Sequence, residues 1–360
     1  MTPSQATSLY GSRLFTTATD RDTWRVLARG ALAQNTWASY DFKFQQFHAF
    51  CESIGLRALP ASTTTVLRWI LHLFREDRVH GTSIQPYLSA INRVHRDLGL
   101  AAPADGHLVA TARRGFVRLH TTAPVPRPGE VTAPTRSQRT PVPAIVALRA
   151  VQHGLRTNDD YVRTCCAIVV HAFLFASRAS SVVGIPISAY EFHPDGSLLF
   201  REDARKTGGP SRVLCVPHTP TNTGHPVDLL RRHHDQRLRS CRQQHSRPDH
   251  VALFAHKDLP RTSASACVSA ALTHVLRVVD YTVPPGVTYS SHSLRSGAAT
   301  AAIAAGAPLP AVMAWCGWRS LSSAQRYIDP TARASAATDV FFSFLRPAVS
   351  ASPSGHISNA

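Results

Sequence analysis

The sequence has few of the features that mark secreted, membrane-spanning or metal-binding proteins. Its seven cysteines are an odd number, and the absence of any CxxC pair argues against a disulfide framework and a zinc knuckle. The longest apolar run, residues 167–175, is too short to cross a bilayer, and residues 2–13 lack the basic start and apolar centre of a signal peptide. We therefore expect an intracellular protein in a reducing compartment, with no membrane span and no metal site.

Lysine and acidic residues are also scarce. The chain has 3 lysines and 36 arginines against 22 acidic residues, and its net charge is +17. Residues 1–140 carry 17 basic and 9 acidic side chains (17 − 9 = +8), and the remainder carries 22 and 13 (22 − 13 = +9). GC-rich codon usage would explain arginine in place of lysine, but it does not explain the excess of basic over acidic residues. A polyanion that touches both halves, namely nucleic acid, is the expected partner.

The chain of 360 residues is longer than one hydrophobic core usually supports, which favours two domains. Residues 1–22 have the composition of a flexible tail. Apolar residues then recur at three- and four-residue steps and predict a helical domain over residues 23–120. Its first helix ends near Gly55, Ser62 or Thr63 caps the second, Ser83 caps the third, and the fourth covers residues 107–119. The fourth helix presents three basic residues as candidate DNA contacts: Arg113, Arg114 and Arg118.

Residues 121–143 contain six prolines and no helical pattern, which predicts an extended linker. The second domain is expected over residues 144–347, followed by a flexible tail over 348–360. Short β-prone runs separated by PDG and KTGGP turns predict a small antiparallel three-stranded sheet over residues 187–216. The rest of this domain is helical in pattern, so the predicted fold class is mainly α with a small sheet. Helices are predicted at about 144–152, 161–176, 227–244, 263–279, 293–305, 308–316, 322–327 and 334–345.

Four residues near the C-terminal end of the sequence are candidates for catalysis: His292, Arg295, Trp318 and Tyr327. The pair His292–Arg295 means little alone, because His153–Arg156 and His234–Arg237 have the same spacing. It is followed, however, by a Gly-Trp turn at Trp318 and by Tyr327 nine residues later. The adjacent pair His233 and His234 has no cysteine partners, and we interpret it as solvated surface.

Four segments resemble the motifs of the tyrosine recombinases, the family of phage integrases and related site-specific recombinases. SHSLRSGAATAAIAAG is similar to the second conserved box, and CGWRSLSSAQRYI to the turn and nucleophile helix. AFLFASRASSVVGI resembles the first box, which places the first arginine at Arg178. ARKTGGPSRVLCVP resembles the β-hairpin motif, which places its lysine at Lys206. NTWASYDFKFQQFHAFCESIG and LSAINRVHRDLGL resemble the helical core-binding domain, so the resemblance covers about residues 30–345.

The resemblance implies a role for each residue. Arg178 and Arg295 would clamp the phosphate, because the planar guanidinium stays charged and binds oxygens in pairs. His292 and Trp318 would donate further hydrogen bonds to it. Tyr327 would be the nucleophile that holds the DNA end as a phosphotyrosine ester, and Lys206 would protonate the leaving oxygen, which lysine can do because it can titrate.

The expected function is strand exchange on double-stranded DNA by a homotetramer, in the setting of a mobile element, without cofactor or metal. The family commonly has an acidic residue three positions after its first arginine, where this chain has Ser181. Two alternatives therefore stay open: a DNA-binding protein that has kept the fold without catalysis, and a type IB topoisomerase-like enzyme. The apolar face predicted for residues 334–345 would suit docking on a neighbouring subunit or packing on its own domain.

Overall fold

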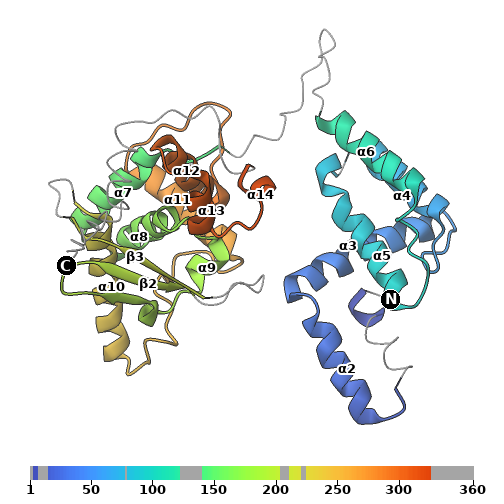
Figure 1. Ribbon diagram of the computed structural model, residues 1–360, viewed down its shortest axis with the longest axis horizontal. Helices are drawn as coiled ribbons and strands as arrows, with labels where there is room; N and C mark the ends of the chain where they lie inside the picture. Colours follow the sequence, from blue (N-terminus) through green and yellow to red (C-terminus); the bar gives the residue numbers. More distant parts are fainter. Residues whose placement is uncertain are drawn as a thin grey trace, which may run out of the picture. The chain divides into compact units, whose positions relative to one another are not determined.

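The computed structural model describes residues 3–6, 15–77, 79–121, 140–202, 211–219 and 224–325. Contacts divide the chain into two compact units, Met1–Thr135 and Arg136–Ala360 (Figure 1). The predicted helix over 334–345, the tail over 348–360 and most of the predicted linker lie outside the described residues. The predicted limits of tails, linker and domains stay predictions.

The first unit is helical. Its elements are α2 (Ala18–Gly30), α3 (Gln34–Ser53), α4 (Thr63–Arg75), a 3-10 turn at Gly81–Ser83, α5 (Gln85–Asp97) and α6 (His107–Thr121). The predicted cap of α4 is confirmed, because the Ser62 side chain accepts a hydrogen bond from the Thr65 N–H at 3.1 Å. The aromatic stripe of α3 forms the core, where Phe44 and Phe47 are fully buried beside Trp69 of α4.

One helix of this unit was not predicted, and one predicted helix cap was wrong. Helix α2 begins at Ala18, inside the segment predicted as tail, and Thr17 caps it. Ala28 is its one buried residue, and its first five residues, ATDRD, are mostly polar, so its start carries no apolar pattern. Ser83 lies in the 3-10 turn and does not cap α5, whose first turn is instead favoured by a proline at its start.

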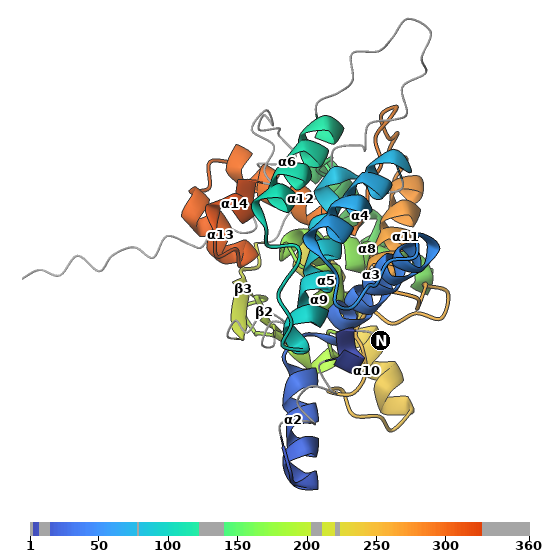
Figure 2. The same ribbon diagram turned by 90° about the vertical axis from the view of Figure 1, so that its right-hand side faces the viewer.

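The second unit packs its helices around α8 (Asp160–Leu174), in which every residue from Arg163 to Leu174 is buried. α8 contacts α7 (Ala144–Arg156), α10 (Pro226–Gln243), α11 (Ala264–Val278) and α12 (Ser291–Ala304). The remaining helices are α9 (Ala179–Val183), α13 (Leu309–Cys316) and α14 (Leu321–Gln325). Seen from the side, α13 and α14 lie together on one flank of the unit (Figure 2).

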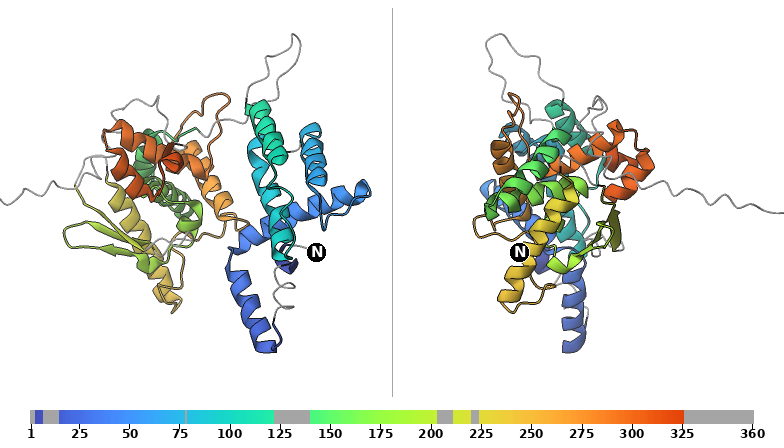
Figure 3. Two further views of the ribbon diagram at one scale, coloured as in Figure 1. Left: turned by 45° about the vertical axis from the view of Figure 1, so that its right-hand side comes forward. Right: turned by 90° about the vertical axis from the view of Figure 1, so that its left-hand side faces the viewer.

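A small sheet forms one edge of this unit (Figure 3). Its strands are β1 (Tyr190–Phe192), β2 (Leu198–Glu202) and β3 (Arg212–Val216), and they pair antiparallel in the order β1-β2-β3. The predicted three-stranded antiparallel sheet and the mainly helical fold class are therefore confirmed. The register places Glu202 of β2 opposite Arg212 of β3.

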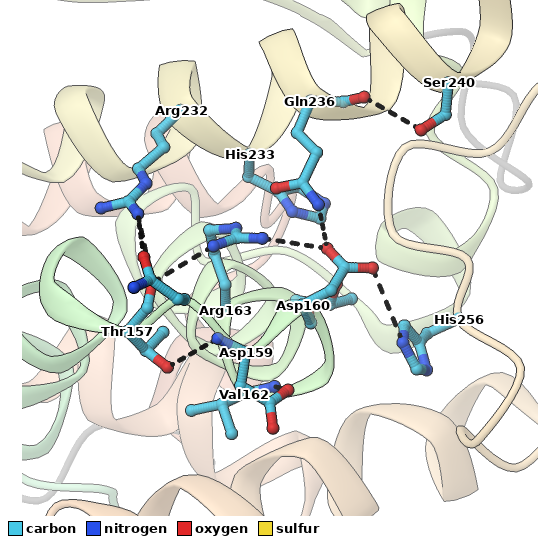
Figure 4. A network of polar contacts seen from close by, with 12 residues as sticks. Thr157, Asp159, Asp160, Val162, Arg163, Arg232, His233, Gln236, Ser240 and His256 are labelled. Carbon is cyan, nitrogen blue, oxygen red and sulfur yellow. Dashed lines mark hydrogen bonds and ion pairs between the residues drawn. The ribbon is translucent and has the colours of Figure 1, made fainter. Parts of the chain in front are cut away.

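A network of polar contacts connects the start of α8 to α10 (Figure 4). Asp160 accepts hydrogen bonds from Arg163 at 3.2 Å and from Gln236 at 2.8 Å, and its second oxygen lies 3.7 Å from the His256 Nε2 atom. His233, one helical turn before Gln236, stacks on the Phe254 ring with an interplanar angle of 6°.

His233 and His234 are buried, with 0% and 9% of their surface exposed, so the interpretation of this pair as solvated surface was wrong. The reason is that α10 packs against the chain near Phe254, which no local pattern announces. Among the described residues, no group of three or more His, Cys, Asp or Glu side chains is placed to hold a metal ion. No described helix is both long enough and apolar enough to span a membrane.

Candidate active site

Arg295 stands at the meeting point of three motif segments. It lies on α12 with 3% of its surface exposed. Its guanidinium donates one hydrogen bond to the carbonyl of Ala176 and another to the carbonyl of Cys316. Ala176 precedes Arg178 by two residues, and Cys316 precedes Trp318 by two residues. One buried side chain therefore joins the backbones that carry two of the other predicted phosphate ligands, Arg178 and Trp318.

Trp318 packs against the same guanidinium. The Arg295 carbon Cζ lies 5.3 Å from the Trp318 ring centroid, a cation–π distance. α13 ends in a Schellman turn, in which Gly317 has φ 65° and the Trp318 N–H donates to the Met313 carbonyl at 2.8 Å. This left-handed conformation favours glycine, and it directs Trp318 back onto Arg295.

Arg178 has the opposite environment. α8 ends in a second Schellman turn, with Ala176 at φ 44° and the Ser177 N–H donating to the Ala172 carbonyl at 3.0 Å. Arg178 follows as the exposed cap residue of α9. Its guanidinium makes no hydrogen bond or ion pair with any residue that the structure describes. It is the exposed, charged group at the edge of this cluster.

His292 lies in the first turn of α12, one turn before Arg295, and is exposed. Further along the helix, Gly297 gives close access to the chain that precedes α7. A Cβ atom at Gly297 would lie 2.1 Å from the Val142 carbonyl oxygen. The Val142 N–H donates to the Ser293 carbonyl at 3.0 Å. The backbone at Val142 is thus fastened to the helix that carries His292 and Arg295.

A second arginine, which the sequence did not single out, repeats the contacts of Arg295. Arg212 of β3 donates to the Trp315 carbonyl and, at 3.4 Å, to the Phe175 carbonyl. These carbonyls immediately precede those bound by Arg295. Arg212 lies in the segment that resembles the hairpin motif, but its contacts with the ends of α8 and α13 have no signal in the sequence.

Next to Arg178 in the chain, Ser177 belongs to a buried hydrogen-bonded group with His171 and Tyr190. The His171 ring bonds the Tyr190 hydroxyl at 2.5 Å through Nδ1 and the Ser177 hydroxyl at 3.2 Å through Nε2. Burial, together with the positive charge of Arg212, lowers the pKa of His171 to about 3. The imidazole is therefore neutral at working pH and serves to fix Ser177, the neighbour of Arg178.

Two predicted catalytic residues, Lys206 and Tyr327, lie outside the described residues. Lys206 falls in the connection between β2 and β3, and Tyr327 falls two residues after the end of α14. Ser181, at the position where an acidic residue was expected, is half-buried in α9, and its N–H donates to the Arg178 carbonyl at 2.9 Å.

Comparisons with known proteins bear on the family and the fold. The model of the phage integrase family matches residues 212–333. The second unit contains a phage integrase family domain. The matched span of this integrase domain includes Arg212, His292, Arg295 and Trp318 as well as Tyr327. No curated protein matches the sequence.

Solved tyrosine recombinases share the fold. The Tn1549 transposon integrase in complex with transposon right end DNA is 13% identical with a TM-score of 0.52, covering 93% of this chain and 96% of that one. A lambda integrase dimer bound to a COC′ core site is 15% identical with a TM-score of 0.50, covering 86% and 93%. XerH bound to a palindromic difH substrate is 10% identical with a TM-score of 0.50, covering 89% and 83%. These likenesses confirm the predicted fold, and the match of the phage integrase family model to residues 212–333 agrees with the predicted family.

Proposed function

We propose that this protein cleaves and rejoins duplex DNA through a 3′-phosphotyrosine on Tyr327, as a site-specific recombinase of a mobile element. The observation that carries the proposal is the position of Arg295, which binds the backbone two residues before Arg178 and two residues before Trp318. The charge of +17 suits a DNA substrate. The solved integrases of this fold named above are complexes with DNA.

In the proposed reaction the phosphodiester lies between exposed Arg178 and the cluster around Arg295. The transition state carries extra negative charge on the non-bridging oxygens, which guanidinium N–H groups and the Trp318 indole N–H stabilise. The Tyr327 oxygen attacks phosphorus and its proton passes to His292, which exchanges protons near neutrality. The bond from phosphorus to the 5′ oxygen breaks, and Lys206 protonates that oxygen. The ester keeps the energy of the broken bond, so rejoining needs no cofactor.

The first unit would hold the duplex. Arg114 and Arg118 are exposed on α6 and Arg113 is half-buried there, so these side chains are candidates for phosphate contacts. We further propose assembly as a homotetramer on DNA. Mass photometry with and without duplex DNA measures the assembly, and a single copy on every duplex would contradict it.

The test is covalent capture on nicked suicide duplexes whose central sequence is randomised. The wild type should give a protein–DNA adduct stable in SDS, with a phosphorylated peptide containing Tyr327. Tyr327→Phe should give none, whereas Tyr161→Phe, at a tyrosine that packs on His256 and His274, should react normally.

Each other outcome selects an alternative. Sequence-specific binding without an adduct in the wild type would identify a binding protein that lacks catalysis. An adduct that persists in Tyr327→Phe would show that another residue is the nucleophile. Relaxation of supercoiled plasmid by a monomer would favour a topoisomerase-like enzyme.

A further inference from the structure

Arg212 and Arg295 both donate hydrogen bonds to carbonyls at the ends of α8 and α13. Arg212 binds the carbonyls of Phe175 and Trp315, and Arg295 binds those of the next residues, Ala176 and Cys316. We call these two side chains and four carbonyls the arginine clasp. α8 and α13 both end in it, although their ends are about 140 residues apart in sequence.

The C-terminal ends of α8 and α13 favour positively charged side chains. The last carbonyls of a helix lack partners within the helix and carry partial negative charge. Arginine side chains satisfy them and balance the helix dipole. Two guanidinium groups at two converging C-termini therefore hold the helix ends together.

Glu202 fixes the orientation of Arg212. The two residues are directly opposed in the register of β2 and β3, and the Arg212 Nε atom donates to the Glu202 carboxylate. Their side chains are 10% and 15% exposed, for Glu202 and Arg212 respectively. Among the described residues, Glu202 is the one buried acidic residue. With Nε held by the carboxylate, the planar group has its two terminal nitrogens directed at the helix ends.

We propose that Glu202 and Arg212 are positioning residues of the active site, through which the sheet sets the spacing between Arg178 and Trp318. Arg178 follows Phe175 by three residues, and Trp318 follows Trp315 by three residues. A shift of either helix end therefore displaces a proposed phosphate ligand. Since phosphoryl transfer depends on placement within about an ångström, loss of the tie should slow cleavage without removing any group that touches DNA. This inference rests on the proposed function for its effect on rate.

The experiment compares Glu202→Gln, Arg212→Lys and Arg212→Met with matched controls on the same sheet. Glu191 and Arg201 form an exposed ion pair between β1 and β2 at 2.7 Å, so Glu191→Gln and Arg201→Met repeat the chemistry away from the clasp. Adduct formation is measured in single turnover at saturating suicide DNA, which separates the rate constant from the amplitude. Arg212→Met should lower the rate constant roughly 100-fold with unchanged DNA affinity. Glu202→Gln and Arg212→Lys should lower it by smaller factors, and the controls should match the wild type.

A merely structural role would reduce the amplitude, which reports the folded fraction, and leave the rate constant unchanged; that result would overturn the proposal. Hydrogen exchange supplies a readout independent of cleavage. Amides in peptides covering 172–183 and 313–320 should exchange faster in Glu202→Gln and in both Arg212 variants, but not in the controls. Unchanged exchange at both helix ends would also overturn the proposal, even if the wild type forms no adduct. If the wild type formed no adduct but the Glu202 and Arg212 variants showed the predicted faster exchange, the proposed function would be contradicted and the positioning role would stand.

Discussion

Arg295 donates a hydrogen bond to the carbonyl of Ala176, a residue 119 positions earlier in the chain. This contact makes Arg295 part of the folded core, since its guanidinium is buried and also bonds the Cys316 carbonyl. Arg178, the other arginine of the proposed phosphate clamp, is exposed at the cap of α9. The two arginines share a proposed role in chemistry but differ in what they contribute to stability.

The first prediction separates these roles. Arg295→Ala should lower the free energy of unfolding by about 3 kcal/mol, because each buried carbonyl left without a donor costs about 1–3 kcal/mol. Arg178→Ala should change it by less than about 0.5 kcal/mol, as is usual for exposed sites. Both variants should fail to form the covalent adduct. Urea unfolding and suicide-DNA capture measure the two effects, and equal stability of the two variants would contradict the assignment.

Helices and sheet were predictable where the signal is local. The Ser62 cap, the aromatic stripe around Phe44 and the turn-separated β runs each specify an element through neighbouring residues. The start of α2 was missed because its first five residues, ATDRD, are mostly polar and show no apolar pattern. His233 was misjudged because its burial depends on Phe254, a partner from another part of the chain.

The candidate site shows the same division. The resemblance of the motifs identified Arg178, Arg295 and Trp318 as candidates. Their positions in the sequence did not indicate which hydrogen bonds connect the segments that carry them. The joining contacts run from side chains to backbone carbonyls, which have no residue-type signature. Arg212 could therefore be identified as a member of the site only from the convergence of the ends of α8 and α13 on its side chain.

The second prediction concerns the basic face of α6. The double variant Arg114→Ala/Arg118→Ala should weaken binding to a duplex of random sequence. It should also reduce the slope of log K against log salt concentration by about 0.9 for each phosphate that the variant no longer neutralises. Arg96→Ala is the control, because Arg96 is paired with Asp105 at 2.6 Å. Fluorescence anisotropy at several salt concentrations measures the slope, and a slope equal to that of the control would exclude these arginines as phosphate ligands.

The third prediction uses two helical glycines. Gly297→Ala would place a Cβ atom 2.1 Å from the Val142 oxygen, and the backbone would have to move. We expect a loss of roughly 3 kcal/mol in the stability of the second unit, as for a severe overpacking change. Gly115→Ala on α6 meets nothing within 4 Å, so it should stabilise the first unit by about 0.5–1 kcal/mol through helix propensity. Calorimetry of both variants checks the opposite signs, and a tolerated alanine at 297 would refute the close approach.

The fourth prediction concerns pH. Burial lowers the pKa of His171 to about 3, of His225 to about 4 and of His233 to about 4. In the unfolded chain the pKa of these rings lies near the ordinary histidine value of 6.5. Above pH 6.5 both states are neutral and the stability is fully present. As pH falls from about 6.5 toward about 4, only the unfolded state takes up protons, so each ring removes about 1.4 kcal/mol of stability per pH unit.

Urea unfolding between about pH 7.5 and about pH 5 covers the upper part of this window and measures the loss, and His233→Gln should reduce the slope by about one proton. His250→Gln is the control, since its side chain is 71% exposed and should leave the slope unchanged. The comparison rests on slopes, because His233→Gln also removes the bond from the ring to the Leu253 carbonyl at 3.0 Å and so lowers stability at every pH. If His233→Gln kept the wild-type slope, the ring would have to be protonated in the folded state. That would require an acidic partner beside the Nδ1 atom, a buried position with no hydrogen-bond partner among the described residues.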